Sequence, residues 1–291
     1  MTGVVQIREV GPRDGLQPEA PVTAADRIRL ITALVAAGLR EVEVAAFVSP
    51  RAVPAMAGAA DVVRDLPSSA AVEWWALVPN VRGASLALDA GITHLSVTVS
   101  ASAAYSQRNV GMSPSESLDA AATIAGMAPA VDVVISCAFG SPYEGEIGVG
   151  VVSGMAARCA GLGASVTLAD TTGMATPRRI GDVIAATGPD VGLHLHDTRG
   201  TALVNAYAAM ELGVTRFDSA VGGLGGSPFA AGAGGNLATE DLVYLCDDLG
   251  VTTGVDLGRL LAASSVAASL VGRPVPSRVA AAGPRDRLAE A

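Results

Sequence analysis

The chain has 291 residues, 50% of them hydrophobic, which is enough for a sizeable core in one large domain. Its formal net charge of −9 at pH 7 argues against a nucleic-acid partner, because a phosphate backbone needs a basic surface. No run of about 18 apolar residues predicts a membrane span, and the N-terminus lacks the basic flank and apolar segment of a signal peptide. We therefore expect a cytoplasmic protein, and three cysteines without metal-site spacing fit a reducing compartment.

All nineteen basic residues are arginine, and the sequence contains no lysine. GC-rich codon usage is the simplest cause of this bias. Whatever the cause, the bias excludes a lysine Schiff base and a phosphate loop of the Walker type, since both need the lysine amine. Carbon–carbon bond chemistry next to a carbonyl then needs another electron sink, and a divalent metal ion is the obvious one.

In chain order, short segments rich in β-branched residues alternate with longer segments rich in Ala and Leu, which is typical of βα units around a parallel sheet. The predicted strands cover residues 4–10, 41–46, 72–78, 94–100, 131–137, 165–170, 191–196 and 216–221. The predicted helices between them cover residues 24–37, 53–64, 82–89, 114–128, 151–162, 177–187 and 201–212. Eight such units without a linker predict an α/β fold, a single (β/α)8 TIM barrel. An open doubly wound sheet fits less well, because no glycine-rich nucleotide turn follows the first strand.

The sequence continues beyond the eighth predicted strand. A loop built almost wholly of Gly, Ala, Ser and Pro comes first, with the glycine content of a lid, and two further helices at 237–249 and 257–271 follow it. We expect one domain over residues 1–291, with the barrel at about 4–221, the lid loop at 222–235, helices within 237–271 and a tail at 272–291.

Unusual polar residues collect where the predicted strands end. They are Arg13 and Asp14 after the first strand, Glu43 in the second, Asp170 in the sixth, His194 and His196 in the seventh, and Asn236 after the loop that follows the eighth. In a barrel of this kind the catalytic site forms at the C-terminal ends of the strands. We therefore expect these side chains to meet at one mouth of the barrel.

Two of the three histidines in the chain lie two residues apart in the seventh predicted strand. Because side chains alternate along a strand, His194 and His196 share one face, and the two neighbouring leucines face an apolar layer. Two imidazoles, the carboxylate of Asp14 and the amide oxygen of Asn236 suit a hard or borderline divalent cation. The ligand mix favours Mg²⁺ or Mn²⁺ and does not exclude Zn²⁺ or Fe²⁺.

Each of these residues has a structural alternative. Arg13 and Asp14 could form a turn closed by an Asx hydrogen bond. Glu43 could be the buried partner of an arginine. Asn236 could cap the helix predicted to begin at the next residue, and the two histidines could be structural residues on a polar strand face.

The remaining histidine and the cysteines are weaker candidates. His94 begins the fourth predicted strand, so we expect it at the opposite end of the barrel in a structural role. Cys137 ends the fifth predicted strand and could face the site, whereas Cys159 and Cys246 fall on predicted helices and are expected in the core.

Six segments together resemble the 3-hydroxy-3-methylglutaryl-CoA lyase (HMG-CoA lyase) family of the DRE-TIM metallolyases. They are GPRDGLQPE at 11–19, AAFVSPRAVPAM at 45–56, SCAFGSPYEG at 136–145, ADTTGMATP at 169–177, HLHDTRG at 194–200 and GGLGGSPFAAGAGGNLATEDLVYL at 222–245. The resemblance extends from about residue 4 to about residue 280. The GPRDGLQ opening distinguishes the chain from the related isopropylmalate and homocitrate synthases, which carry a TLRDG-type motif.

The resemblance implies a TIM barrel whose divalent metal ion is bound by Asp14, His194, His196 and Asn236. It implies that Arg13 stabilises the enolate of the departing acyl-CoA, and that Glu43 and Asp170, together with Glu9, shape the site. The implied catalytic set is Arg13, Glu43, Asp170, His194 and Ser227, and the implied substrate-binding set is Arg13, Gln17, Arg108 and Asn109. Two lysines of the family, near the CoA end of the site, are replaced here by Gln107 and Arg108.

The chain departs from the family in the glycine-rich loop. Ser227 occupies the position of the family's catalytic cysteine, and Phe229 stands where a tyrosine is usual. A thiol that titrates near 8.5 can exchange protons near neutrality, whereas a serine hydroxyl is far less acidic and needs an activating base.

The sequence predicts a divalent-metal-dependent lyase that cleaves HMG-CoA, or a related 3-hydroxyacyl-CoA, to acetyl-CoA and an oxo-acid (acetoacetate in the case of HMG-CoA). One alternative is a metal-dependent aldolase or condensing enzyme on a different oxo-acid, with Ser227 binding substrate. Another is a weakly catalytic barrel that only binds an acyl-CoA or a protein, and the complete set of metal ligands argues against it. We expect an acyl-CoA or oxo-acid substrate, no nucleic-acid or membrane partner, and a homo-oligomer, specifically a dimer.

Overall fold

The computed structural model describes residues 3–226 and 234–285. Its strands are all parallel and close into a barrel in sequence order, because β1 pairs with β8 as well as with β2. The strands are β1 (Gln6–Glu9), β2 (Glu41–Ala46), β3 (Glu73–Val78), β4 (His94–Ser100), β5 (Ala130–Ser136), β6 (Ser165–Asp170), β7 (Gly192–Leu195) and β8 (Arg216–Ser219). The predicted α/β TIM barrel is confirmed.

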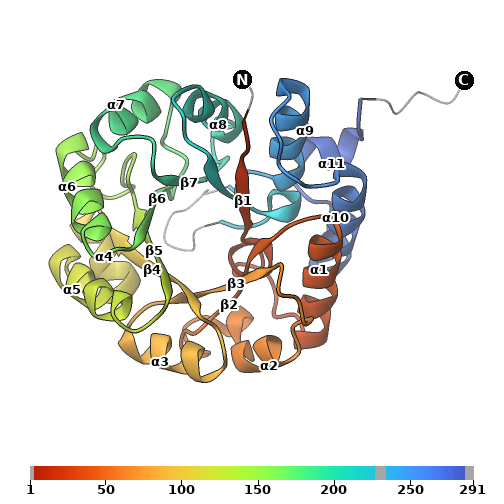
Figure 1. Cartoon of the computed structure of the whole chain (residues 1–291), viewed down its shortest axis with the longest axis horizontal. Helices are drawn as coiled ribbons and strands as arrows, with labels where there is room; N and C mark the ends of the chain where they lie inside the picture. The colour runs from red at the N-terminus through yellow and green to blue at the C-terminus, as the bar shows by residue number, and fades with distance from the viewer. Residues whose placement is uncertain (1–2, 227–233, 286–291) are drawn as a thin grey trace, which may run out of the picture.

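The helices form a ring outside the barrel (Figure 1). They are α1 (Ala24–Ala36), α2 (Ala59–Arg64), α3 (Val81–Asp89), α4 (Ala103–Val110), α5 (Pro114–Ala125), α6 (Val149–Ala160), α7 (Pro177–Thr187), α8 (Ala202–Glu211), α9 (Thr239–Leu249), α10 (Leu257–Val271) and α11 (Arg278–Ala282). None of the helices in the described part of the chain is both long enough and apolar enough to cross a membrane.

Side-chain caps fix where several helices begin. The hydroxyl of Thr23 accepts a hydrogen bond from the backbone N–H of Asp26 at 3.1 Å, and Ser113 and Glu116 form a reciprocal capping box before α5. Such caps satisfy backbone N–H groups that have no partner within the helix. Thr176 caps α7 in the same way, with proline as the first helical residue.

The helix predicted over residues 53–64 is wrong in its first half. A 3-10 turn, η2 (Pro54–Met56), precedes α2, and Gly58 separates the two with φ of 76°. A residue in this left-handed region cannot continue a right-handed helix, and glycine adopts it without steric cost. The predicted helix therefore begins only at Ala59.

Several short helical segments were not predicted. They are a π-helical turn, η1 (Gly11–Gly15), a 3-10 turn, η3 (Val221–Gly223), and the helices α4 and α11. The two helices begin after the capping serines Ser102 and Ser277, whose hydroxyls accept backbone N–H groups. Helices of eight and five residues are too short for an apolar period to stand out in the sequence. The capping serines are the only local signal for these two helices.

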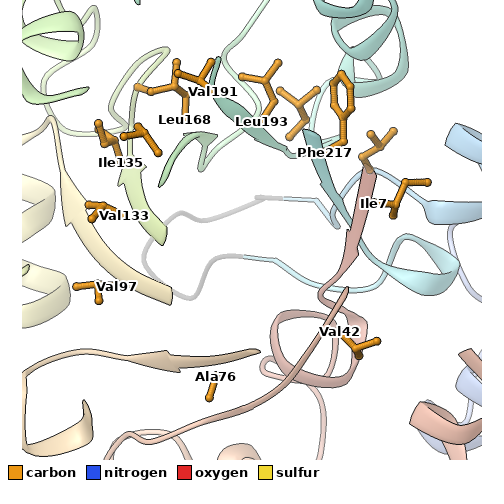
Figure 2. Packing of buried hydrophobic residues seen from close by; sticks show 14 of the residues in the cluster. Ile7, Val42, Ala76, Val97, Val133, Ile135, Leu168, Val191, Leu193 and Phe217 are labelled. Atoms are coloured by element: carbon orange, nitrogen blue, oxygen red, sulfur yellow. The ribbon is translucent and has the colours of Figure 1, made fainter. Parts of the chain in front are cut away.

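The apolar core lies between the barrel wall and the helices. Figure 2 shows Val97, Val133 and Phe217 directed away from the barrel axis. Leu193 points the same way, and both it and Leu195 are fully buried, which confirms that they face the apolar layer. Burying alternate side chains on the outer face leaves the other residues of each strand to line the barrel interior.

The interior of the barrel below the mouth is polar. The guanidinium group of Arg8 donates to both carboxylate oxygens of Asp218, at 2.8 and 2.9 Å, and to Asp132 Oδ2 at 2.8 Å. Thr167 donates a further hydrogen bond to Asp132, also at 2.8 Å. These contacts join strands on opposite sides of the barrel, so that the buried charges satisfy one another's hydrogen bonds.

The C-terminal helices pack beside the first helix of the chain. α10 lies against α1 (Figure 1) and also contacts η3, and α9 contacts η3. The end of the chain thereby supports the segment that leads into the glycine-rich loop.

Candidate active site

The two histidines meet at the C-terminal end of β7. The Nε2 atoms of His194 and His196 are 3.3 Å apart, and both side chains are buried. On the other side of each ring, Nδ1 has an acceptor: Asp218 Oδ2 for His194 and the Gly234 carbonyl for His196, each at 3.1 Å. Both Nε2 atoms therefore point at the same position at the mouth of the barrel.

The turn η1 carries Arg13 and Asp14 to the same place. Glu9, at the end of β1, accepts the backbone N–H groups of Gly11 at 2.7 Å and Val221 at 2.9 Å, and its other oxygen accepts the Thr239 hydroxyl at 2.6 Å. The π-helical turn after β1 is therefore held by a buried carboxylate that also binds η3 and the start of α9.

Asn236 reaches the site from the far side of the glycine-rich loop. It forms an antiparallel bridge with His196, and its Nδ2 donates to Asp14 Oδ2 at 2.8 Å and to the Leu224 carbonyl at 2.9 Å. A Cβ atom on Gly225, whose φ is 123°, would come within 2.3 Å of this amide. Glycine is required there because the loop backbone passes directly beside Asn236. The helix cap of α9 is Ala238, so the capping alternative for Asn236 is wrong.

These contacts create a cluster with the geometry of a metal site. Ligand atoms of Asp14, His194 and His196 all lie within 4.8 Å of one another. Two ligand atoms bound side by side to an octahedral cation at about 2.1 Å are about 3 Å apart, close to the separation of the two Nε2 atoms. The Oδ1 atom of Asn236 is buried and has no hydrogen-bond partner. Since buried polar atoms are rarely left unpaired, this oxygen fits a ligand of a cation.

Arg13 connects the cluster with β2. Its Nη1 donates to Asp14 Oδ1 and its Nε to Glu43 Oε2, both at 2.5 Å. Glu43 is thus the buried partner of an arginine, as one alternative proposed, and it also lines the mouth. The guanidinium group cannot rotate away, because carboxylates bind it from two sides.

Burial and neighbouring charges shift the pKa values of the three cluster residues in different directions. Burial alone would raise the pKa of Asp14, but Arg13 and the two histidines lower it. Burial and the neighbouring His194 lower the pKa of His196 to about 4, so this imidazole is neutral at physiological pH. For His194, burial would lower the pKa, but the hydrogen bond and charge of Asp218 raise it.

A cavity of about 120 Å³ opens beside the cluster and is divided into two halves. The half formed by η1, β2, β7 and β8 carries the charged and imidazole groups. The half formed by β3 to β6 and α4 is neutral. Its lining residues are Leu77, Thr98, Tyr105, Asn109, Val134, Ser136, Ala169 and Thr171.

The other predicted residues are placed differently. Gln17 and Asn109 line the cavity, whereas Arg108 is exposed on α4 and packs on the Tyr143 ring, 4.2 Å from its centroid. Asp170 accepts the backbone N–H groups of Met174 and Ala175 and so shapes the loop after β6. Burial raises the pKa of Asp170 to about 6. Ser227 lies outside the described residues.

Sequence reasoning missed Asp218. It lies in the middle of β8, faces the interior and contacts both His194 and Arg8. The signal was present, because an acidic residue inside a predicted barrel strand must face the interior or be paired. Cys137, which could have faced the site, is buried with φ of 57°, and burial raises its pKa to about 12. His94 lies at the start of β4, as predicted, against the Trp75 ring.

Together, the fold and the site define a (β/α)8-barrel protein with a cluster of three residues that could hold a metal ion at the C-terminal ends of its strands. A family model described as HMGL-like matches residues 4–267. The chain belongs to the HMGL-like family.

Similar proteins agree over nearly the whole chain. A Pseudomonas aeruginosa 3-hydroxy-3-isohexenylglutaryl-CoA/hydroxy-methylglutaryl-CoA lyase is 42% identical, covering 96% of both chains. A Chloroflexus aurantiacus (R)-citramalyl-CoA lyase is also 42% identical, covering 96% of this chain and 95% of its own. An Acinetobacter baumannii HMG-CoA lyase, solved with coenzyme A and 3-methylmalate, has a TM-score of 0.94 at 36% identity and covers 99% of this chain and 98% of its own. The predicted membership of the HMG-CoA lyase group, and with it the lyase class, is confirmed.

We predict that Glu9 makes stability depend on pH. Burial raises its pKa from 4.5 to about 7, so the contribution of Glu9 to stability is complete below pH 4.5 and is lost as pH rises to 7. Glu9→Gln mimics the protonated acid and should lack this pH-dependent loss. The difference in free energy of unfolding, variant minus unaltered protein, should therefore grow by up to about 3 kcal/mol as pH rises from 4.5 to 7. Denaturant titrations at several pH values measure it, with the exposed Glu211→Gln as control. A flat difference for Glu9→Gln would contradict the assignment.

We also predict that loss of a cluster residue weakens cation binding. The protein should bind one Mn²⁺, and His196→Ala or Asn236→Ala should reduce the affinity by at least about 10-fold, because each removes a ligand atom. Free Mn²⁺ can be followed by electron paramagnetic resonance during titration. His94→Ala, which removes the remaining histidine at the other end of the barrel, is the matched control and should bind normally. Equal affinity in all variants would rule out the site.

Proposed function

We propose that the protein cleaves a 3-hydroxyacyl-CoA of the HMG-CoA type into acetyl-CoA and an oxo-acid, with a divalent cation bound by Asp14, His194, His196 and Asn236. The observation that carries the proposal is the convergence of these four residues with Arg13 at one barrel mouth. One carboxylate, two imidazoles and an amide oxygen favour Mg²⁺ or Mn²⁺. The cation would polarise the C3 hydroxyl oxygen of the substrate and lower its pKa.

Arg13 is placed to stabilise the negative charge that cleavage creates. When the bond between C2 and C3 breaks, its electron pair passes to C2, and the charge develops on the thioester oxygen as an enolate. A guanidinium group held in place before the reaction stabilises this charge more in the transition state than in the substrate. By analogy with oxyanion-hole donors its contribution is about 3 kcal/mol. The contacts of Arg13 with Asp14 and Glu43 hold it in that position.

The reaction needs proton transfer at two atoms. The C3 hydroxyl loses its proton, and C2 of the enolate gains one, so the overall cleavage neither consumes nor releases a proton. We propose that Ser227 takes part in this proton transfer, as its position in the family motif implies, together with Glu43 and His194 at the mouth. A serine hydroxyl is a weaker acid than the thiol of cysteine, so protonation of C2 is expected to be slow.

The neutral half of the cavity suits the acyl part of the substrate. Hydroxyl groups of Thr98, Ser136 and Thr171 can donate hydrogen bonds to a carboxylate or carbonyl, and Leu77 and Val134 offer apolar contact to a substituent on C3. We propose that Gln17 and Asn109, which both line the cavity, bind substrate, and that the exposed Arg108 contacts the CoA portion. The structure of a relative with coenzyme A and 3-methylmalate supports a CoA thioester of a short hydroxy acid.

Relatives of equal identity differ in their named substrates, which include HMG-CoA and citramalyl-CoA. We therefore propose the class of carboxylated 3-hydroxyacyl-CoA thioesters and take HMG-CoA as the first member to test. The proposed cytoplasmic location and homodimeric state rest on the sequence alone.

Cleavage should depend on the cation and on Arg13. We expect no acetyl-CoA from HMG-CoA or citramalyl-CoA after treatment with EDTA, and recovery when Mg²⁺ or Mn²⁺ is added. Arg13→Lys keeps the charge but loses the two-sided binding, and kcat should fall about 10² to 10³-fold. The exposed Arg51→Lys is the control and should be fully active. Full activity after exhaustive chelation would refute the proposal.

Replacing Ser227 should reveal whether proton delivery limits the rate. Ser227→Cys supplies a group that titrates near 8.5, and cleavage should accelerate by at least about 10-fold at pH 8 with unchanged Mn²⁺ affinity. Ser227→Ala removes both hydroxyl and thiol and serves as the control. If the cysteine variant is no faster than the unaltered protein, Ser227 does not occupy the position of the proton donor.

A further inference from the structure

Asp218 lies at the boundary between two cavities inside the barrel. It lines the mouth cavity, which contains the metal cluster, and also a smaller cavity of about 40 Å³ on its other side. Only 6% of its surface is exposed, so nearly all of its interactions are with the protein. A side chain in this position has contacts on both sides, so contacts in the polar interior can fix its orientation toward a residue of the site.

On the side of the site, Asp218 contacts one atom of a cluster residue. Its Oδ2 is 3.1 Å from Nδ1 of His194, and the Nε2 atom of the same ring is 3.3 Å from Nε2 of His196. A carboxylate accepts hydrogen bonds and, when ionised, donates none. The proton of the neutral His194 ring must therefore be on Nδ1, and the lone pair is on Nε2, where the cluster needs it.

On the other side, Arg8 fixes the carboxylate itself. Its Nε and Nη2 bind the two oxygens of Asp218 in a fork, at 2.8 and 2.9 Å, and Nη2 also binds Asp132. Planar two-point contacts of this kind define the orientation of a carboxylate better than a single hydrogen bond. Burial would raise the pKa of Asp218, but the charge of Arg8 and the bond to His194 hold it well below its usual range.

The two histidines differ in this respect. The Nδ1 atom of His196 faces the backbone carbonyl of Gly234, a neutral acceptor at the edge of the glycine-rich loop. His194 instead has an ionised partner that belongs to a strand. Its orientation is thus set by the barrel wall and does not depend on the conformation of the loop.

We infer that Asp218 is a positioning residue for the metal site: with Arg8 behind it, it holds His194 as the Nδ1–H tautomer with Nε2 directed at the cation. The inference rests on the proposed metal site. A carboxylate behind a ligand histidine also increases the electron density at the opposite nitrogen and so strengthens its bond to a cation. In this role Asp218 acts through His194 and is not itself a ligand of the cation.

The tautomer can be measured in the unaltered protein. The chain has three histidines, so selective ¹⁵N-histidine labelling gives three rings, with His94 as an internal reference outside the site. At a pH where imidazole is neutral, without metal and with Mg²⁺, His194 should show a protonated Nδ1 and an unprotonated Nε2. A His194 ring protonated on Nε2 would overturn the inference, whether or not the protein binds metal.

The contribution to binding can be measured with two matched variants. Asp218→Asn removes the charge and offers only one acceptor to the donors of Arg8 and His194, so Mn²⁺ affinity should fall about 10 to 100-fold and the His194 signals should indicate a tautomer mixture. Ser96→Ala is the control. Ser96 contacts Arg8 at 3.4 Å in the same buried layer but lies outside the Asp218–His194 contact, so its loss should leave affinity and tautomer unchanged.

The outcomes separate this inference from the proposed function. If the unaltered protein binds no Mn²⁺, the proposed metal site fails, and the tautomer in the metal-free protein still decides the role of Asp218. If the unaltered protein binds Mn²⁺ and folded Asp218→Asn binds it equally well with a single His194 tautomer, the positioning role is wrong. An equal loss in Ser96→Ala would show that any disturbance of the layer weakens binding and would also overturn it.

Discussion

The site depends on an imbalance of buried charge inside the barrel. Among the described residues, two guanidinium groups meet four carboxylates there in two groups of ion pairs, one around each arginine, and His194 lies between the two groups. With His194 neutral, these six charged side chains have a formal charge of minus two. They are Arg8, Arg13, Asp14, Glu43, Asp132 and Asp218. Unbalanced charge is costly in a buried environment, so a divalent cation bound at the cluster, as proposed, would offset part of this charge. In the proposed holoenzyme, cation binding would therefore also stabilise the fold.

The same arrangement explains why the mouth has two chemically different halves. Charged groups come from the first two and the last two strands, which are neighbours because β1 pairs with β8. The strands between them contribute hydroxyl and apolar groups. Closure of the barrel thus places the charged side chains and the imidazoles on one wall. The opposite wall is left to recognise an uncharged or hydrogen-bonding part of the ligand. In the proposed reaction the charged wall acts on the bond that breaks.

Much of this could be predicted from the sequence, for identifiable reasons. The histidine pair was recognisable because strand periodicity puts residues two apart on one face, and the leucine between them is buried as that periodicity requires. Asp14 and Asn236 are 222 positions apart, and no local pattern could show that one donates a hydrogen bond to the other. Their grouping at one mouth was predicted from the barrel topology, which brings the ends of the strands together, and was implied again by the family resemblance.

The misses also have physical causes. Asp218 was overlooked although it lies within the strand predicted over residues 216–221, because its partners Arg8 and His194 are distant in sequence and no local pattern shows these contacts. The expectation that Asp170 shapes the site stays a prediction, and the contact of its carboxylate with the backbone of its own loop depends on a turn geometry that the sequence does not specify. The late start of the helix predicted over residues 53–64 has a similar cause, since the left-handed conformation of Gly58 depends on the path of the chain on both sides.

Glu9 brings together parts of the chain that a simple description of the fold would separate. Its carboxylate binds the turn that carries Arg13, the turn after β8 and the first residue of α9. Asn236 likewise comes after the eight-stranded barrel is complete. The segment after the last strand is therefore part of the machinery and not an appendage. A minimal barrel cut at the end of β8 would keep its eight βα units and lose the means to organise its own mouth, so shortening the scaffold and preserving its chemistry are incompatible aims.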